Sequence, residues 1–395
     1  MSTDPIVIVG GKRTPMGGFQ GELAGLTAPQ LGTAAIKAAI AESGVAPDEV
    51  DQGVMGCVLP AGLGQAPARQ AVRNAGLPDS VACTTVNKMC GSGMKAVMDA
   101  HDALAAGSAD VIIAGGMESM TNAPYILPKV RAGLRIGHAE VLDHMYIDGL
   151  EDAYQRGRLM GTFAESTAQH YQFSREAQDA YAIESLKRAQ NAITSGAFDS
   201  EVVPVSVPTR GGAVEVRIDE QPGKAKLDKI PTLKPAFAKD GTVTAANSSS
   251  ISDGAAALVL MRASTAKAKG LTPLARIVGH ATHARAPEWF TTAPIGAMQS
   301  LFKRTGWGVN DVDLFEINEA FAVVTMAAMQ DLGLDHAKVN VHGGACALGH
   351  PVGASGARLI VTLMAALKRY GKTRGVASLC IGGGEATAVA IELAA

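Results

Sequence analysis

The sequence predicts an α/β fold made of two similar halves related by a pseudo-dyad, with a further region inserted between them. Segments 47–56 and 309–318 each follow a helix-ending glycine and lead through a short acidic link into an apolar strand. Each is followed by a glycine-bounded helix start, a helix, and a strand that ends on consecutive glycines, at 115–116 and 382–384. Four features in the same order indicate an internal duplication, and alternating strands and helices predict a buried sheet covered by helices.

The region between the two halves differs from both in composition. It is richer in charge, proline and glycine, as in 221–229. Its strongest element is a helix that begins at the cap residue Ser174 and ends at Gly196. We therefore predict three units: an N-terminal half, a loop domain that covers one face of the core and holds a ligand, and a C-terminal half. Their bounds are residues 1–120 plus 248–270, 121–247, and 271–395. A mere oligomerisation or surface domain is the alternative for the middle unit.

Composition excludes several classes of function. With 47% hydrophobic and 18% charged residues, the 395-residue chain can bury a large core, part of it between subunits. A net charge of −2 without a basic run argues against nucleic acid and anionic membranes as partners. We expect no membrane span and no signal peptide. Five scattered cysteines without a Cys-x-x-Cys pair argue against a disulfide framework or a structural zinc site, and for a reducing cytoplasm.

Cys90 is the most informative single residue. It stands where an apolar strand-like run stops and a helix begins, and Met94, Val97 and Met98 lie on one face of that helix. Unpaired N–H groups and the helix dipole at such a position favour a thiolate, so we expect a lowered thiol pKa and a nucleophile. The alternative, a small buried hydrophobe, is the usual fate of a free cysteine, and position alone does not decide between them.

The second half contributes three further candidates. His350 is surrounded by glycines and followed by Pro351, so its backbone must pass close to another group. Cys380 closes an apolar strand and faces a glycine loop, although it could be a core cysteine. Asn318 follows another strand, where a buried polar side chain is costly without a partner or a task. The pseudo-dyad would bring Cys90 near these loops.

Taken together, these segments resemble the thiolase family. Residues 86–93 resemble its nucleophile segment, and 318–321, 349–351 and 380–384 resemble its other three active-site blocks; 241–249 with 253–257, and 115–120, are similar to two further family segments. Six blocks in family order cover essentially the whole chain. The resemblance implies a five-layered α-β-α-β-α core formed by the two duplicated halves, with an inserted loop domain.

The resemblance also assigns chemical roles. Cys90 would attack an acyl-CoA and carry the acyl group as a thioester in a ping-pong reaction. His350 would take the proton of Cys90 and lie at the oxyanion site of the substrate, and Cys380 would move a proton at the α-carbon. Asn318 would hold a water at one oxyanion hole. The N–H groups of Cys90 and Gly382 would form the other.

Coenzyme A and acyl-CoA are implied as substrates, with no permanently bound cofactor and no metal. By resemblance, Ser249 would meet the pantetheine arm. The residues expected to line the same tunnel are Met160, Phe237, Ala245, Ala320 and Phe321. An arginine that contacts the nucleotide end of coenzyme A in relatives falls at Pro222 here, so Lys224 or Lys226 would replace it.

Some positions depart from the family pattern. Leu159 precedes Met160 where a histidine is found in short-chain biosynthetic members, and Trp289-Phe290 adds bulk near the acyl pocket. His342 stands where asparagine is common. None of these touches the proposed catalytic residues, so the reaction stands while the acyl-chain preference stays open.

Our leading hypothesis is an acetyl-CoA C-acyltransferase that makes or cleaves short 3-ketoacyl-CoA. The alternatives are a degradative thiolase for medium or long chains, a decarboxylating ketosynthase, and a non-catalytic protein that binds CoA or lipid. Ketosynthases typically have a second histidine where this chain has Cys380. Retention of Cys90, His350 and Cys380 together argues against the non-catalytic protein. A homo-oligomer is expected, with a tetramer favoured over a dimer.

Two remaining histidine arrangements predict no metal site. His280 and His283 are three residues apart, but no carboxylate or cysteine motif accompanies them. His101 lies on the predicted face of the first helix, where a packed core histidine is the better interpretation.

Overall fold

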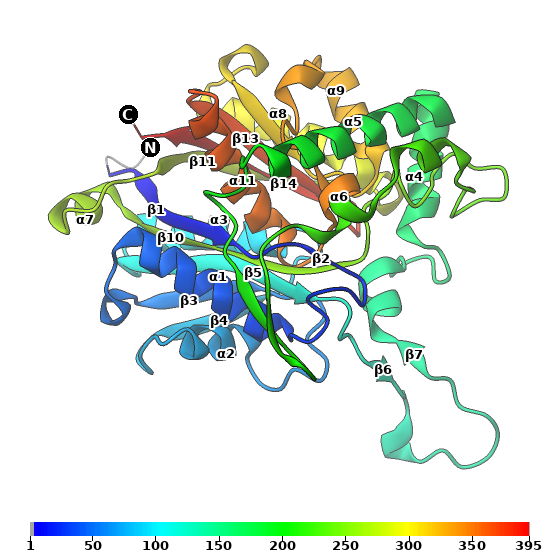
Figure 1. Cartoon of the computed structure of the whole chain (residues 1–395), viewed down its shortest axis with the longest axis horizontal. Coiled ribbons are helices and arrows are strands. Elements are labelled where there is room, and N and C mark those ends of the chain that lie inside the picture. The colour runs from blue at the N-terminus through cyan, green and yellow to red at the C-terminus, as the bar shows by residue number, and fades with distance from the viewer. Residues whose placement is uncertain (1–3, 395) are drawn as a thin grey trace.

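The structure is a computed structural model that describes residues 4–394. The signal-peptide prediction depends partly on residues 1–3, and these, with the outermost ends of the two predicted halves, lie outside the described residues. Helices and strands alternate in layers (Figure 1), so the predicted α/β fold is confirmed.

The strands of the N-terminal half form the order β4-β3-β5-β10-β1, and those of the C-terminal half form β12-β13-β14-β11. The bounds are β1 Ile6–Arg13, β3 Gln52–Gly56, β4 Ala82–Val86, β5 Val111–Ser119, β10 Ser252–Arg262, β11 Ala275–Ala284, β12 Leu314–Ile317, β13 Arg374–Ile381 and β14 Glu385–Leu393; the short β2, Gly17–Gly18, pairs with β10. In both halves a parallel pair lies at the outer edge, β3 with β4 and β12 with β13. Within residues 4–394, the two sets of strands are hydrogen-bonded to each other only where β1 pairs with β11, at Val7–Arg276 and Ile8–Ala275.

Helices form the other three layers. Helices α1 (Ala28–Ser43) and α2 (Pro67–Asn74) cover the outer face of the first set of strands, and α8 (Ala293–Thr305) covers the outer face of the second with α9 (Ala322–Leu332) beside it. Helices α3 (Ser92–Ala105) and α11 (Ser355–Arg369) pack side by side between the two sets, at the centre of the molecule (Figure 1). The observed order of layers is therefore α-β-α-β-α.

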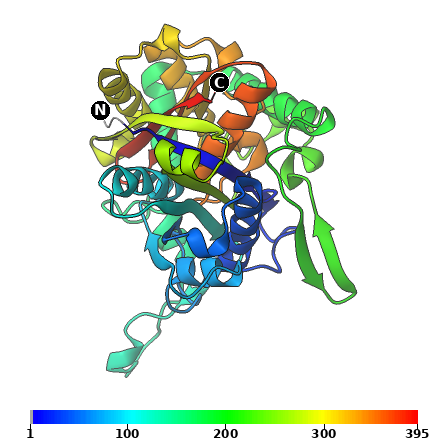
Figure 2. The same cartoon turned by 90° about the vertical axis from the view of Figure 1, so that its left-hand side faces the viewer.

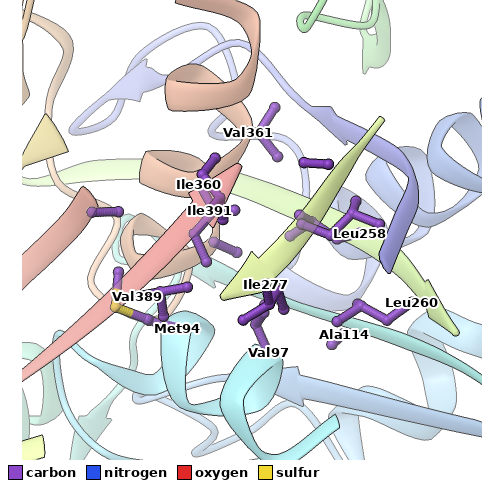
Figure 3. Packing of buried hydrophobic residues seen from close by; sticks show 14 of the residues in the cluster. Met94, Val97, Ala114, Leu258, Leu260, Ile277, Ile360, Val361, Val389 and Ile391 are labelled. Atoms are coloured by element: carbon purple, nitrogen blue, oxygen red, sulfur yellow. The ribbon is translucent and has the colours of Figure 1, made fainter. Parts of the chain in front are cut away.

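Alternation along the strands explains how one sheet serves two cores. Ile6 and Ile8 of β1 point into the central cluster around α3 and α11, whereas Val7 and Val9 point into the outer cluster under α1. Figure 3 shows the central cluster, in which α3, α11 and strands of both halves contribute side chains. Burying each such aliphatic side chain contributes about 1.5–3 kcal/mol.

The two copies of the repeat share the way a helix ends and the turn that follows it. Gly44 and Gly306 end α1 and α8 in the left-handed region, with φ of 72° and 74°. Each is followed by a single 3₁₀ turn, η1 (Pro47–Glu49) and η6 (Val309–Asp311). This arrangement confirms the repeat that the sequence predicted.

In each copy of the repeat, an aspartate carboxylate accepts hydrogen bonds from two backbone N–H groups. Asp51 Oδ2 accepts the N–H groups of Asp110 at 2.7 Å and Val111 at 3.0 Å, at the start of β5. Asp313 Oδ2 accepts two N–H groups at the start of β13, at 3.0 and 2.9 Å. Each carboxylate thus satisfies backbone donors that the neighbouring strand leaves unpaired.

The segment between the halves extends over the C-terminal half and out into solvent. Its elements are β6 Tyr125–Ile126, η2 Val130–Ala132, β7 Leu142–Asp143, η3 Tyr146–Leu150, α4 Met160–Tyr171, α5 Arg175–Thr194, β8 Val205–Thr209, β9 Gly212–Val216, α6 Glu220–Lys224 and η4 Leu227–Thr232. The β6–β7 arm protrudes from the body (Figures 1 and 2), whereas the β8–β9 hairpin buries Val205, Val207 and Val216 in the outer cluster under α1. Ser174 Oγ accepts the N–H of Ala177 at 3.2 Å, which confirms the predicted start of α5.

The remaining helical elements are short: α7 Ala263–Ala268, η5 Pro287–Thr292, η7 His336–Lys338 and α10 Ala345–Leu348. Among residues 4–394, no helix combines the length and the apolar character that crossing a membrane requires. The three-unit division predicted from the sequence stays a prediction.

Candidate active site

The turn before α3 presents Cys90. Helix α3 begins at Ser92, so Cys90 lies two residues before it, as predicted. Met89 adopts a left-handed φ of 48°, which bends the chain sharply. Ser92 Oγ holds the bend, because it accepts the N–H of Lys88 at 2.8 Å and donates to the carbonyl of Met89 at 2.7 Å.

The expected lowering of the Cys90 pKa is wrong. Burial raises the pKa of this thiol, and the nearby Glu118 carboxylate adds to the rise. Hydrogen bonds from the backbone N–H groups of Gly382 and of Cys90 itself oppose the rise without cancelling it. A helix start favours an anion, but here the cost of taking a thiolate out of water is larger. The Cys90 side chain is therefore a neutral thiol at pH 7.

Glycines let the second half approach the Cys90 turn closely. A Cβ on Gly91 would lie 2.4 Å from Cδ1 of Ile381, at the end of β13. Gly383 and Gly384 both have φ of 94°, which turns the chain from β13 into β14. These contacts explain why glycines follow each cysteine closely in the sequence.

Cys380 lies at the end of β13 and is fully buried. Burial raises its pKa well above the ordinary thiol value, and the Cys90 thiol beside it adds to the rise. Phe163, Phe290 and Phe321 belong to the same apolar cluster, with ring centroids 6.2 and 6.5 Å apart in edge-on contacts. The predicted approach of the two thiols is thus observed, against an aromatic wall.

His350 is held in one orientation by Ser355. Its Nδ1 lies 2.6 Å from Ser355 Oγ, and that hydroxyl donates to the carbonyl of Pro351 at 3.0 Å. Since the hydroxyl proton is used there, Nδ1 must donate, and Nε2 is left as the acceptor nitrogen of the ring. Burial lowers the pKa of His350 to about 3, and the positive charge of Arg358 contributes.

Asn318 lies next to His350. Its Nδ2 is 3.5 Å from His350 Nε2, and its backbone N–H bonds the Ser378 carbonyl at 3.0 Å. Its Oδ1 is buried and has no hydrogen-bond partner among residues 4–394. An unpartnered buried amide oxygen beside a histidine lone pair is suited to hold a water or a substrate group.

Glu118 ties the two halves together beneath Cys90, although sequence reasoning assigned it no role. This buried carboxylate accepts the N–H groups of Val58 at 2.9 Å, Leu59 at 3.1 Å and Gly353 at 2.9 Å. Burial raises the pKa of Glu118 to about 7. Its position within the buried strand β5, two residues after a pair of glycines, was the available signal.

Glu319, beside Asn318, was likewise left without a partner by the sequence. Its carboxylate accepts hydrogen bonds from Tyr181 at 2.8 Å and Ser185 at 2.7 Å, both on α5. It also accepts the Asn340 amide at 2.8 Å and the Cys346 N–H at 3.0 Å. Glu319 therefore joins the loop-domain helix to the loops of the C-terminal half.

Most residues proposed to contact coenzyme A lie together. Met160, Phe237, Ala320 and Phe321 belong to the apolar cluster that contains Cys380. Phe237 meets Phe321 edge-on, with centroids 5.9 Å apart. Ser249 is fixed at the cluster by hydrogen bonds from its N–H and its hydroxyl to the Ala320 carbonyl, at 2.9 and 3.0 Å.

The two lysines proposed for the nucleotide end of coenzyme A lie in different surroundings. Ala245 lines a cavity of about 250 Å³ whose rim carries Lys226 and Lys229. Lys224 is engaged by an ion pair with Glu220 on its own helix. Of the two lysines considered from the sequence, Lys226 is the one that faces this cavity.

Two family models match the chain almost end to end. The model described as thiolase, N-terminal domain, matches residues 6–264, and the model described as thiolase, C-terminal domain, matches residues 271–393. The chain belongs to the thiolase family. The resemblance on which the sequence interpretation depended is thus confirmed.

Individual members of the family match this chain over nearly the full length of both proteins. Acetyl-CoA acetyltransferase of Cupriavidus necator is 49% identical over 389 residues, covering 98% of this chain and 99% of that protein. The crystal structure of the Bacillus anthracis acetyl-CoA acetyltransferase superposes with a TM-score of 0.97 at 40% identity, covering 100% of both chains. Acat5 thiolase from Ascaris suum, solved in complex with coenzyme A, gives 0.94 at 42% identity, covering 99% and 100%.

Proposed function

We propose that this thiolase is an acetyl-CoA C-acetyltransferase, which interconverts two acetyl-CoA with acetoacetyl-CoA and free CoA. The observation that carries the proposal is the pair of thiols, Cys90 and Cys380, brought together from the two halves of the molecule. One thiol carries the acyl group and the other moves the proton, so neither role alone would require the pair. The names of the related enzymes support the same activity.

In the first half-reaction, Cys90 sulfur attacks the thioester carbonyl of acetyl-CoA. The thiol proton passes to His350 Nε2, the nitrogen left free by Ser355. The N–H groups of Cys90 and Gly382, which point at the Cys90 sulfur, support our proposal that they stabilise an oxyanion there. The C–S bond to CoA then breaks, the departing sulfur takes the proton from His350, and acetyl-Cys90 remains.

In the second half-reaction, Cys380 gives its proton to His350 and removes the α-proton of a second acetyl-CoA. The enolate forms a carbon–carbon bond to the acetyl carbonyl on Cys90, and the Cys90–acyl bond breaks. Cys90 sulfur then takes the proton from His350, so both thiols and the neutral imidazole are restored. Asn318, beside His350 Nε2, would orient a water at the enolate oxygen.

The aromatic wall beside Cys380 supports a short acyl chain. Phe163, Phe290 and Phe321 are buried, Phe290 meets each of the other two rings edge-on, and all three belong to the apolar cluster that contains Cys380, so we propose that they limit the length of the acyl chain. A degradative thiolase for medium or long chains is the second candidate. Rates of thiolysis with 3-ketoacyl-CoAs of increasing length distinguish them, and we expect acetoacetyl-CoA to be cleaved fastest.

The basic test is thiolysis of acetoacetyl-CoA by CoA, followed by loss of the enolate absorbance. A complete lack of turnover with acetoacetyl-CoA and with longer 3-ketoacyl-CoAs would reject the enzyme and favour a non-catalytic CoA-binding protein. Turnover that requires a malonyl group and releases CO₂ would instead indicate a ketosynthase.

Cysteine variants separate the two thiol roles. We expect Cys90→Ala to abolish turnover and the acyl-enzyme mass adduct, because the nucleophile is gone. Cys380→Ala should still form the adduct on Cys90 but block carbon–carbon bond formation. An adduct on Cys90→Ala, or normal condensation by Cys380→Ala, contradicts the assignment.

We further propose that coenzyme A and acyl-CoA are its ligands, that no cofactor stays bound, and that it works as a cytoplasmic homotetramer. All five cysteines are free, in keeping with a reducing compartment. The protruding β6–β7 arm exposes apolar side chains, with Ile136 99% exposed and Tyr125 68% exposed. Such an arm is suited to burial against another copy of the chain. Light scattering after size-exclusion chromatography tests the tetramer directly.

A further inference from the structure

Two histidines and an aspartate converge far from the catalytic thiols. His101 and Asp102 lie in the C-terminal part of α3, and His280 lies on β11 of the other half. Asp102 Oδ1 is 3.0 Å from His101 Nδ1 and 2.8 Å from His280 Nε2. Each of the three residues offers one possible ligand atom, and these three atoms all lie within 4.8 Å of one another.

The geometry and the types of donor fit a metal ion. The two rings cross at 85° with centroids 5.0 Å apart, so they direct ring nitrogens at one carboxylate oxygen without stacking. Two imidazole nitrogens and one carboxylate oxygen suit the borderline divalent ions and not Mg²⁺ or Ca²⁺, which prefer oxygen ligands. We propose that His101, Asp102 and His280 bind one transition-metal ion of the Zn²⁺, Co²⁺ or Ni²⁺ class, with solvent completing the coordination.

Solvent access suits this site. The side chains of His101 and His280 are 21% and 12% exposed, and that of Asp102 is 59% exposed, so water reaches the carboxylate side.

Metal binding would rearrange protons without gaining or losing any. Each ring would turn a lone pair towards the ion and carry its proton on the opposite nitrogen. The hydrogen bonds from His101 Nδ1 and His280 Nε2 to Asp102 Oδ1 would be replaced by bonds to the ion. His280 Nδ1 is buried without a partner among residues 4–394, so its proton would be left unpaired, a cost that the bonds to the ion must exceed. The nearby cation Arg304 bonds the His280 carbonyl at 3.2 Å and faces the backbone, not the ring nitrogens.

The site is distinct from the catalytic one. Nine residues of helix separate Ser92, at the start of α3, from His101, a distance of about 14 Å. The ion would connect α3, which follows Cys90 in the N-terminal half, to β11 of the C-terminal half. Sequence spacing suggested His283 as the neighbour of His280, whereas the fold supplies His101 and Asp102 instead.

The experiment uses the full-length chain, stripped of metal with a chelator and titrated with Co²⁺ and Zn²⁺ by calorimetry and visible absorption. We expect one ion per chain and Co²⁺ ligand-field bands without the charge-transfer band of a thiolate. Asp102→Asn and His280→Gln should each weaken binding by at least about 100-fold. His283→Gln, on the same strand, serves as the matched control and should bind as the parent does.

Three results would overturn the proposal. These are no binding by the parent chain, binding by Asp102→Asn and His280→Gln as tight as that of the parent, or a thiolate band that assigns the ion to Cys90 and Cys380. Thiolysis of acetoacetyl-CoA verifies that each variant is folded. If another variant fails to fold, His101→Gln provides a third test of the same three ligands, because the His101 side chain is partly exposed.

Discussion

Ser355 decides which nitrogen of His350 can accept a proton, so a residue outside the predicted catalytic set controls a residue within it. The sequence located Cys90, His350, Cys380 and Asn318 because unusual residues stood at strand ends and among glycines. It could not supply the tautomer of His350, which depends on a hydroxyl five residues further along the chain. It also gave the wrong direction for the pKa of Cys90, since local position reports the helix start but not the depth of burial.

Removal of the Ser355 hydroxyl should therefore affect turnover more than substrate binding. We expect Ser355→Ala to lower kcat of thiolysis roughly ten- to a hundredfold with little change in KM, a part of what a positioned general base contributes. Thr362→Val is the matched control, because it removes another buried hydroxyl from α11 that bonds Glu201 instead. Equal kcat values for Ser355→Ala and the parent enzyme would show that Nε2 needs no such support.

His342 should make stability depend on pH. Burial lowers its pKa to about 4, with Arg369 and Arg13 contributing, and neither ring nitrogen has a partner among the described residues. The unfolded chain takes up a proton near pH 6.5 while the folded one stays neutral, so stability is full above pH 6.5 and falls as the pH approaches 4. From pH 7.5 to pH 5 this residue should cost about 2 kcal/mol.

Urea unfolding of parent and His342→Gln enzyme at both pH values measures this contribution. Between pH 7.5 and pH 5, the free energy of unfolding should fall by about 2 kcal/mol less in His342→Gln than in the parent, because glutamine does not titrate. His138→Gln, which changes a fully exposed histidine, should leave the pH dependence as it is in the parent. If the free energy of unfolding changed with pH by the same amount in His342→Gln and the parent, groups other than His342 would cause the pH dependence.

At the scale of elements, the repeat was predictable because its signals are local. Helix-ending glycines, a short turn and an aspartate before each strand recur in order, and Asp51 and Asp313 perform the same backbone bonding in both copies. The loop domain was less predictable. The sequence gave the start of α5 at Ser174, but the docking of this helix depends on Glu319, which is more than a hundred residues away.

Glu319 offers a test of that docking. Its carboxylate receives four donors, so Glu319→Gln would set an amide N–H₂ against at least one of them and leave buried groups unpaired, at a cost of about 2–4 kcal/mol. We expect faster hydrogen exchange in α5 and a lower thermal midpoint. Asp331→Asn, which alters the exposed contact to Tyr171 of α4, should change neither by much. Unaltered exchange in α5 of Glu319→Gln would mean that this helix docks by apolar packing alone.

At the scale of the whole molecule, the proposed mechanism depends on how closely the two halves approach. Cys90 comes from one half, and His350 and Cys380 come from the other. The sequence predicted this through its pseudo-dyad, but not the backbone contacts that set the distance between the halves. A Cβ on Gly116 of β5 would lie only 2.0 Å from the Gly353 carbonyl oxygen, across the boundary between them.

Gly116→Ala should therefore push the halves apart. The backbone atoms it meets cannot rotate away as a side chain can, so we expect a loss of about 1–3 kcal/mol or more from overpacking. Because Glu118, two residues further along β5, holds Gly353 under the Cys90 turn, thiolysis should fall by a larger factor than the folded fraction does. The measurements are the thermal midpoint and kcat/KM per folded enzyme.

Gly223→Ala is the control, since a Cβ there meets no atom within 4 Å among residues 4–394. Full activity per folded molecule in Gly116→Ala would mean that the two thiols tolerate a shift between the halves, and that their spacing is set within the loops instead.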